Sequence, residues 1–131
     1  MRILIAEDDF ASRKFMLKFL SKFGECDITV DGMEAVDAYL MALDADTPYD
    51  LVCLDIMMPA LDGYQALKAI RDIEQERKIP EDQRAKIIMT TALNEGANEN
   101  KAFDLGCVAY AGKPIDQVKF ESVLRKLELI D

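Results

Sequence analysis

Residues 51–63 read LVCLDIMMPALDG, and this stretch decides the fold class. Four apolar residues run without interruption up to Asp55, which is typical of a strand buried on both faces of a sheet. Pro59 then breaks the chain, and Asp62 stands where an N-cap would begin a helix that we expect to reach about Arg77. The stretch therefore predicts a buried strand, a loop and a covering helix, which together make one βα unit.

The same alternation of short apolar runs and amphipathic stretches repeats along the chain. Apolar strands are predicted at residues 3–6, 26–30, 51–54, 86–89 and 108–111. Helices are expected at residues 12–23, 33–43, 62–77, 94–105 and 116–129. Strands that are apolar on both faces need cover on both, so these βα units predict an α/β protein with a parallel sheet between two helical layers.

The composition limits the chemistry that such a fold can carry. The 131 residues, the size of one domain, include 25 Asp and Glu, 16 Lys and Arg and no histidine, for a net charge of −9. This negative field argues against nucleic acid or an anionic membrane as a direct partner. Without histidine, the chain offers no Ser-His-Asp triad and cannot itself carry a phosphohistidine.

The cysteines and the N-terminus indicate the compartment. The three cysteines are widely spaced, odd in number and free of any C-x-x-C pair, which predicts reduced thiols rather than disulfides or a zinc site. The first residues contain neither a signal peptide nor a membrane segment. We therefore expect a cytoplasmic protein.

The most informative residues stand where the predicted strands end. Four of the five strands are followed by carboxylate, hydroxyl or amino side chains: Glu7, Asp8 and Asp9; Asp55; Thr90 and Thr91; and Lys113. Any one of them alone is typical of a helix cap or an exposed surface residue. Ligands of open parallel sheets bind beyond the carboxyl ends of the strands, so the set as a whole predicts a site.

The crowded carboxylates of this set favour a divalent cation. Two carboxylates about 4 Å apart repel by about 4 kcal/mol at an effective dielectric constant of about 20. Mg²⁺ would relieve this repulsion, and it prefers oxygen ligands and phosphate. With the metal on Asp8 and Asp55 and with Lys113 opposite, a phosphoryl group could approach an Asp55 oxygen while Thr91 donates a hydrogen bond to it. The set predicts metal-assisted phosphoryl transfer to a carboxylate nucleophile.

Four segments, in order, resemble the receiver domain of two-component response regulators. They are RILIAEDD at 2–9, LVCLDIMMPALDG at 51–63, MTTAL at 89–93 and CVAYAGKP at 107–114. The resemblance covers essentially the whole chain, residues 1–131, as a single receiver domain. It implies a flavodoxin-like (βα)5 three-layer sandwich with a five-stranded sheet of order 2-1-3-4-5. It also implies a phosphoacceptor, rather than an enzyme, that serves phosphorelay signal transduction.

The resemblance assigns a role to individual residues. Asp55 would be the phosphorylated aspartate, assisted by Thr91 and Lys113, while Thr91 and Tyr110 would form the switch. The expected Mg²⁺ ligands are Glu7, Asp8, Asp55 and the backbone carbonyl of Met57, with Asp8 and Asp9 as the alternative acidic pair. The family usually has a cis peptide at Lys113-Pro114.

The same resemblance implies partners and an output. A histidine kinase or a histidine phosphotransfer protein would supply the phosphoryl group, and a downstream protein would bind the face from the fourth to the fifth helix after a phosphorylation-dependent surface change. No DNA-binding output domain follows the predicted fifth helix, so we expect a stand-alone receiver, with a domain excised from a longer regulator as the alternative. The apolar Met57 and Leu93 imply slow self-dephosphorylation.

Two other functions are compatible with this fold class. An aspartyl-phosphate phosphatase would need a second Asp two residues after the nucleophile, where this chain has Met57. A flavodoxin-like electron carrier would need Gly, Ser or Thr donors in the first loop, where this chain is acidic. Both are less favoured than the receiver.

Overall fold

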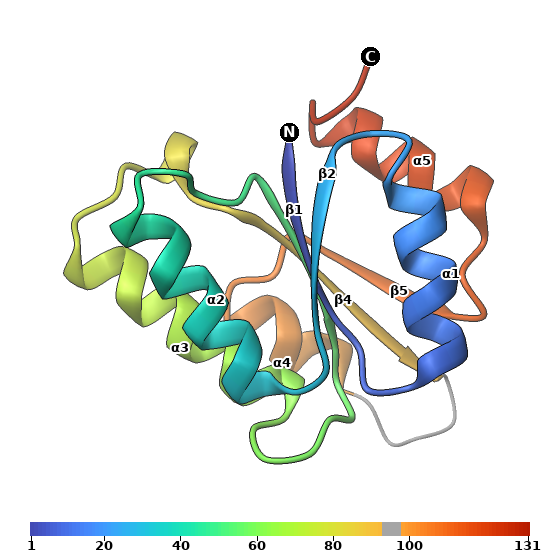
Figure 1. Ribbon diagram of the computed structural model, residues 1–131, viewed down its shortest axis with the longest axis horizontal. Coiled ribbons are helices and arrows are strands. Elements are labelled where there is room, and N and C mark those ends of the chain that lie inside the picture. Colours follow the sequence, from blue (N-terminus) through green and yellow to red (C-terminus); the bar gives the residue numbers. More distant parts are fainter. Residues whose placement is uncertain (93–97) are drawn as a thin grey trace.

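The computed structural model describes residues 1–92 and 98–131, which form alternating strands and helices (Figure 1). Within these ranges, five parallel strands make one sheet in the order β2-β1-β3-β4-β5. The strands are β1 (Arg2–Ala6), β2 (Glu25–Thr29), β3 (Leu51–Asp55), β4 (Lys86–Ala92) and β5 (Ala109–Lys113). The helices are α1 (Phe10–Leu20), α2 (Gly32–Asp44), α3 (Gly63–Glu76), α4 (Glu99–Asp104) and α5 (Gln117–Lys126). The predicted fold class and strand order are confirmed.

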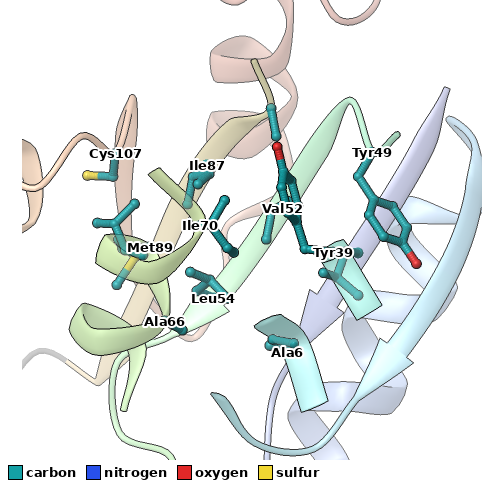
Figure 2. Close-up of a cluster of buried hydrophobic side chains, with 14 of the residues drawn as sticks. Ala6, Tyr39, Tyr49, Val52, Leu54, Ala66, Ile70, Ile87, Met89 and Cys107 are labelled. Atoms are coloured by element: carbon teal, nitrogen blue, oxygen red, sulfur yellow. The ribbon is translucent and has the colours of Figure 1, made fainter. Parts of the chain in front are cut away.

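The helices lie in two layers, one on each face of the sheet. Helices α1 and α5 cover one face, and α2, α3 and α4 cover the other (Figure 1). Because side chains alternate between the faces of a strand, Leu54 of β3 packs toward α2 and α3 while Cys53 packs toward α1 and α5. Each face of the sheet thus has its own hydrophobic core. Figure 2 shows the core on the side of α2, α3 and α4, in which Leu54, Ile70 and Met89 lie close together.

The helix boundaries differ from the predicted ones where capping decides them. Helix α1 begins at Phe10, two residues earlier than predicted, because the Asp9 carboxylate accepts a hydrogen bond from the Ser12 N–H at 2.9 Å. Helix α4 ends before Gly106, as predicted, and that glycine has a φ of 107°. The predicted start of this helix at residue 94 lies outside the described residues. Across those that are described, no helix is both long and apolar enough to cross a membrane.

Strands β4 and β5 extend further toward the carboxyl edge than predicted. Their ladder continues through the pairs Thr91–Gly112 and Ala92–Lys113, so Thr91 and Lys113 lie within the strands. The predicted cis peptide at Lys113-Pro114 is present. The longer ladder fixes the backbone of these side chains on adjacent strands.

A buried polar cluster connects α2, α3 and the start of β4. Glu74 of α3 is fully buried, and its carboxylate accepts hydrogen bonds from the Tyr39 hydroxyl at 2.6 Å and from the Ala85 N–H at 2.9 Å. The Arg71 guanidinium lies 2.6 Å from the same carboxylate and also donates to the carbonyls of Ala85 and Gly106. The cluster holds the long connection between α3 and β4 against the α2–α3 layer.

The start of α3 carries the cap predicted at Asp62. The Asp62 carboxylate accepts from the Gln65 N–H at 2.9 Å, and the Gln65 side chain accepts in return from the Asp62 N–H at 3.0 Å. We expect Asp62→Ala to lower the free energy of unfolding by about 1 kcal/mol, because this reciprocal cap is lost. Urea denaturation measures the change, and Asp62→Asn, which keeps a capping oxygen, should recover most of it. Equal stability of Asp62→Ala and the wild type would contradict this role.

Candidate functional site

Three carboxylates meet at the carboxyl edge of the sheet. Asp55 is the last residue of β3, and Glu7 directly follows β1; both are buried, with 4% and 2% of their surface exposed. Asp8 beside them is exposed. One oxygen from each of these three carboxylates lies within 4.8 Å of the other two. The strand ends thus bring together the acidic residues that the sequence singled out.

Backbone hydrogen bonds and one glycine fix the position of Asp55. Asp55 is paired in register with Thr90, and the Ile56 N–H donates to the Thr90 carbonyl at 3.0 Å. The Gly63 N–H donates to the Ile56 carbonyl at 2.9 Å, so the loop after β3 closes on itself. A Cβ atom at Gly63 would lie 2.4 Å from the Asp55 carbonyl oxygen, and only glycine allows so close an approach.

Lys113 brings a positive charge to the two buried carboxylates. Its Nζ atom lies 2.6 Å from Glu7 Oε2 and 3.3 Å from Asp55 Oδ2. Burial alone would lower the pKa of Lys113, but the hydrogen bond to Glu7 and the nearby negative charges together raise it. The lysine therefore stays protonated at neutral pH, and it contacts both carboxylates from the end of β5.

Asp55 is held in a setting that disfavours its negative charge. Burial raises its pKa to about 7, and the charge of Glu7 adds to the shift while Lys113 opposes it. One lysine does not offset the burial of two neighbouring carboxylates. Three carboxylates with this shortage of positive charge fit a hard divalent cation with oxygen ligands.

The Asp9 side chain contacts helix α1 and does not belong to the cluster of three carboxylates. Its carboxylate caps α1 through Ser12, and this hydrogen bond holds the pKa of Asp9 below its ordinary value. Its backbone N–H donates to Glu7 Oε1 at 3.1 Å, which helps to orient the Glu7 side chain. The geometry therefore groups Glu7 and Asp8 with Asp55, and it gives Asp9 the role of a helix cap.

The hydroxyl residues lie on the neighbouring strands. Thr91 is fully buried in β4, and its hydroxyl donates to the Ala92 carbonyl at 3.2 Å. Tyr110 of β5 is half-buried, and burial raises the pKa of its hydroxyl. Met57 is exposed just beyond Asp55, whereas Leu93 lies outside the described residues. The inference of slow dephosphorylation from these two residues stays a prediction.

Arg13 contributes to the site and was not singled out from the sequence. Its guanidinium donates to the carbonyls of Glu7 and Asp8 at 3.1 and 3.3 Å, which fixes the backbone that carries both carboxylates. The Cζ atom of Arg13 also lies 5.5 Å from the centre of the ring of the exposed Phe10. The one sequence signal for this role is a basic residue in the helix that follows the acidic run.

The chain is similar to known proteins over nearly its whole length. A family model described as the response regulator receiver domain matches residues 3–125. The two-component response regulator 24 of Arabidopsis thaliana is 34% identical over 126 residues, which are 95% of this chain and 81% of that protein. The probable transcriptional regulator ycf29 of Porphyra purpurea is 30% identical, and the chain spans only 55% of its length.

Solved structures agree with this similarity. A co-crystal structure of the Saccharomyces cerevisiae histidine phosphotransfer protein Ypd1 with the receiver domain of Ssk1 matches 96% of this chain and 87% of that chain, with a TM-score of 0.79 and 26% identity. The structure of the receiver domain of the Arabidopsis thaliana histidine kinase CKI1 complexed with Mg²⁺ matches 96% of this chain and 90% of that chain, with a TM-score of 0.79 and 27% identity. The family match over residues 3–125 includes Glu7, Asp8 and Asp55.

Proposed function

Because the chain belongs to the response regulator receiver domain family, we propose that Asp55 accepts a phosphoryl group from a partner's phosphohistidine. The observation that carries the proposal is the setting of Asp55, buried at a strand end among Glu7, Asp8 and Lys113. Receiver domains are signalling phosphoacceptors rather than enzymes that turn over a separate substrate, and we propose that role for residues 1–131 as a single receiver domain.

The proposed step is a displacement at phosphorus. An Asp55 carboxylate oxygen forms the new P–O bond, the P–N bond of the phosphohistidine breaks, and the imidazole nitrogen keeps the electron pair. Lys113 would offset the negative charge of the phosphoryl oxygens, and Thr91 would donate a hydrogen bond to one of them once its hydroxyl leaves the Ala92 carbonyl.

Mg²⁺ fits this site as the cofactor. Glu7, Asp8, Asp55 and the Met57 carbonyl would hold it, and when bound it supplies positive charge to the phosphoryl oxygens. The chain's own contribution is to orient the carboxylates, through Lys113 beside Glu7 and Asp55 and through Arg13 on the loop carbonyls.

The partners and the output follow from the same role. The donor would be a histidine kinase or a histidine phosphotransfer protein, which the likeness to the receiver solved with Ypd1 supports. A downstream protein would bind the face from α4 to α5, which exposes the apolar Phe103, Val108 and Val118, and Thr91 and Tyr110 would act as the switch. We place the protein in the cytoplasm, since its three cysteines are free.

Phosphoryl transfer from a protein donor tests the proposal. We expect a radiolabelled histidine phosphotransfer protein to pass its label to the wild type within minutes in the presence of Mg²⁺. Lys113→Met should slow the transfer at least about tenfold, because the phosphoryl charge is no longer offset. Lys68→Met, which removes an exposed lysine from α3, is the matched control and should transfer like the wild type. A Lys113→Met variant that transfers at the wild-type rate would contradict the role of Lys113.

Magnesium binding should depend on pH. The raised pKa of Asp55 means that its carboxylate is mostly protonated at pH 5 and mostly ionised at pH 8. Mg²⁺ at about 100 times its dissociation constant stabilises a protein by about 2.7 kcal/mol, and we expect the full effect at pH 8 and a much smaller one at pH 5. Thermal unfolding with and without Mg²⁺ measures this difference.

Two neighbouring acids provide the control for that measurement. Asp8→Asn should remove most of the Mg²⁺ effect, whereas Asp9→Asn should keep it, because asparagine still caps α1 and Asp9 is turned to Ser12. Loss of the Mg²⁺ effect in both variants would make Asp8 and Asp9 the acidic pair, and an unchanged effect in Asp8→Asn would contradict Asp8 as a ligand. A Mg²⁺ effect of equal size at both pH values would contradict the protonation of Asp55.

A further inference from the structure

Helix α4 is held by α3 at both of its ends. At its start, the Tyr64 hydroxyl accepts a hydrogen bond from the Asn98 N–H at 2.6 Å and lies 3.2 Å from the Asn98 carbonyl, to which it donates. At its end, Arg71 Nε donates to the Gly106 carbonyl at 3.0 Å. Tyr64 and Arg71 are seven residues apart, so they lie on the same side of α3 two turns from each other.

These polar contacts matter because α4 has little else to hold it. The helix has six residues, fewer than an isolated helix needs to be stable in water, and Ala102 is its one buried side chain. Asn98 is its N-cap: the Asn98 side chain accepts from the Lys101 N–H at 3.0 Å, and its carbonyl accepts from the Ala102 N–H at 3.1 Å. Tyr64 therefore holds the residue on which the first turn of α4 depends.

Tyr64 is also joined closely to the phosphoacceptor. It follows Gly63, whose N–H donates to the Ile56 carbonyl and whose α-carbon packs against the Asp55 carbonyl without room for a side chain. A shift in the backbone of residues 55–56 must therefore move the first turn of α3. The Tyr64 hydroxyl sits on that turn, and the Lys101 Nζ atom lies 4.5 Å above its ring.

We propose that Tyr64 is a positioning residue that transmits a change at Asp55 to α4, through Gly63 and the first turn of α3. This inference rests on the proposed function of Asp55. The route runs through α3, whereas Thr91 and Tyr110 belong to β4 and β5, so the two connections can be separated by mutation.

Hydrogen exchange in α4 tests the inference, with beryllofluoride and Mg²⁺ as the phosphoryl mimic. In the wild type we expect the mimic to change the exchange rates of the Lys101 and Ala102 amides, whose hydrogen bonds end on Asn98. In Tyr64→Phe without the mimic, these rates should rise about fivefold, because the hydroxyl contacts are lost. Adding the mimic to Tyr64→Phe should then change the opening free energy of these amides by less than about half of the change that it causes in the wild type.

A merely structural role of Tyr64 gives a different result. It would raise exchange in α4 by the same factor with and without the mimic, leaving the change due to the mimic equal to that of the wild type, and this would overturn the inference. Tyr49→Phe is the matched control, since it removes a hydroxyl that donates to Asp27 and should leave α4 unchanged. No response of α4 in a wild type that binds the mimic would also overturn the inference. The exchange rates of the Lys113 and Gly63 amides report whether the mimic binds at the site. If the mimic leaves both rates unchanged in the wild type, the proposed function itself fails.

Discussion

The Asp55→Asn variant should unfold at a higher denaturant concentration than the wild type at pH 8 without metal. Burial and the Glu7 charge raise the pKa of Asp55 to about 7 in the folded protein, against 3.8 for an ordinary Asp. The Asp55 carboxyl of the folded wild type thus binds its proton more tightly than the same group in the unfolded chain. The stability of the wild type therefore falls as pH rises from about 4 to about 7. Asparagine carries no charge to bury, so we expect the variant to be about 1–3 kcal/mol more stable at pH 8.

The pH dependence separates this effect from a general gain in packing. Below about pH 3 the wild-type carboxyl is mostly protonated in both the folded and the unfolded states, so the two proteins should then have similar stability. Asp37→Asn, an exposed aspartate of α2, should change stability by less than about 0.5 kcal/mol at either pH. An Asp55→Asn variant that is less stable than the wild type at pH 8 would show that the Asp55 charge is well compensated without a metal.

A loss of stability is expected from Glu74→Ala. The fully buried Glu74 carboxylate accepts from Tyr39, Arg71 and Ala85, and its removal leaves a hydroxyl, a guanidinium and a backbone N–H short of their acceptor. Breaking a buried ion pair by removing one partner costs about 3–5 kcal/mol, which is a large part of the stability of a domain this size. Urea denaturation at neutral pH measures this loss.

The control for Glu74 lies on the same helix. Asp72 pairs with Lys68 at 2.8 Å on the exposed side of α3, and Asp72→Ala should cost less than about 1 kcal/mol because solvent screens that pair. Similar losses for Asp72→Ala and Glu74→Ala would mean that the buried cluster contributes no more than a surface ion pair. The site at the carboxyl edge should be unaffected by the control.

Much of the site could be predicted because its residues come directly at strand ends. The order of apolar runs fixes a parallel sheet, and a parallel sheet brings Glu7, Asp8, Asp55 and Lys113 to the same edge whatever the details of the loops. Asp62 was predictable as a cap for a local reason, since its partner Gln65 is three residues away.

The remaining features depend on contacts between distant segments. The choice between Glu7 and Asp9 as the acidic partner of Asp8 depends on where α1 begins, because Asp9 caps that helix. Glu74 and Tyr39 are 35 residues apart in sequence and Tyr64 and Asn98 are 34 apart, and no local pattern marks either pair. The full length of β4 and β5 likewise follows from their pairing with each other, because the pairs Thr91–Gly112 and Ala92–Lys113 join residues that are distant in sequence.

The most direct test of the central claim is the intact mass of the protein after incubation with acetyl phosphate and Mg²⁺. We predict that the wild type gains one phosphoryl group, that peptide mapping places it on Asp55, and that Asp55→Asn gains none. A wild type that gains no phosphoryl group, or an Asp55→Asn variant that gains as much as the wild type, would contradict the assignment of Asp55 as the phosphoacceptor.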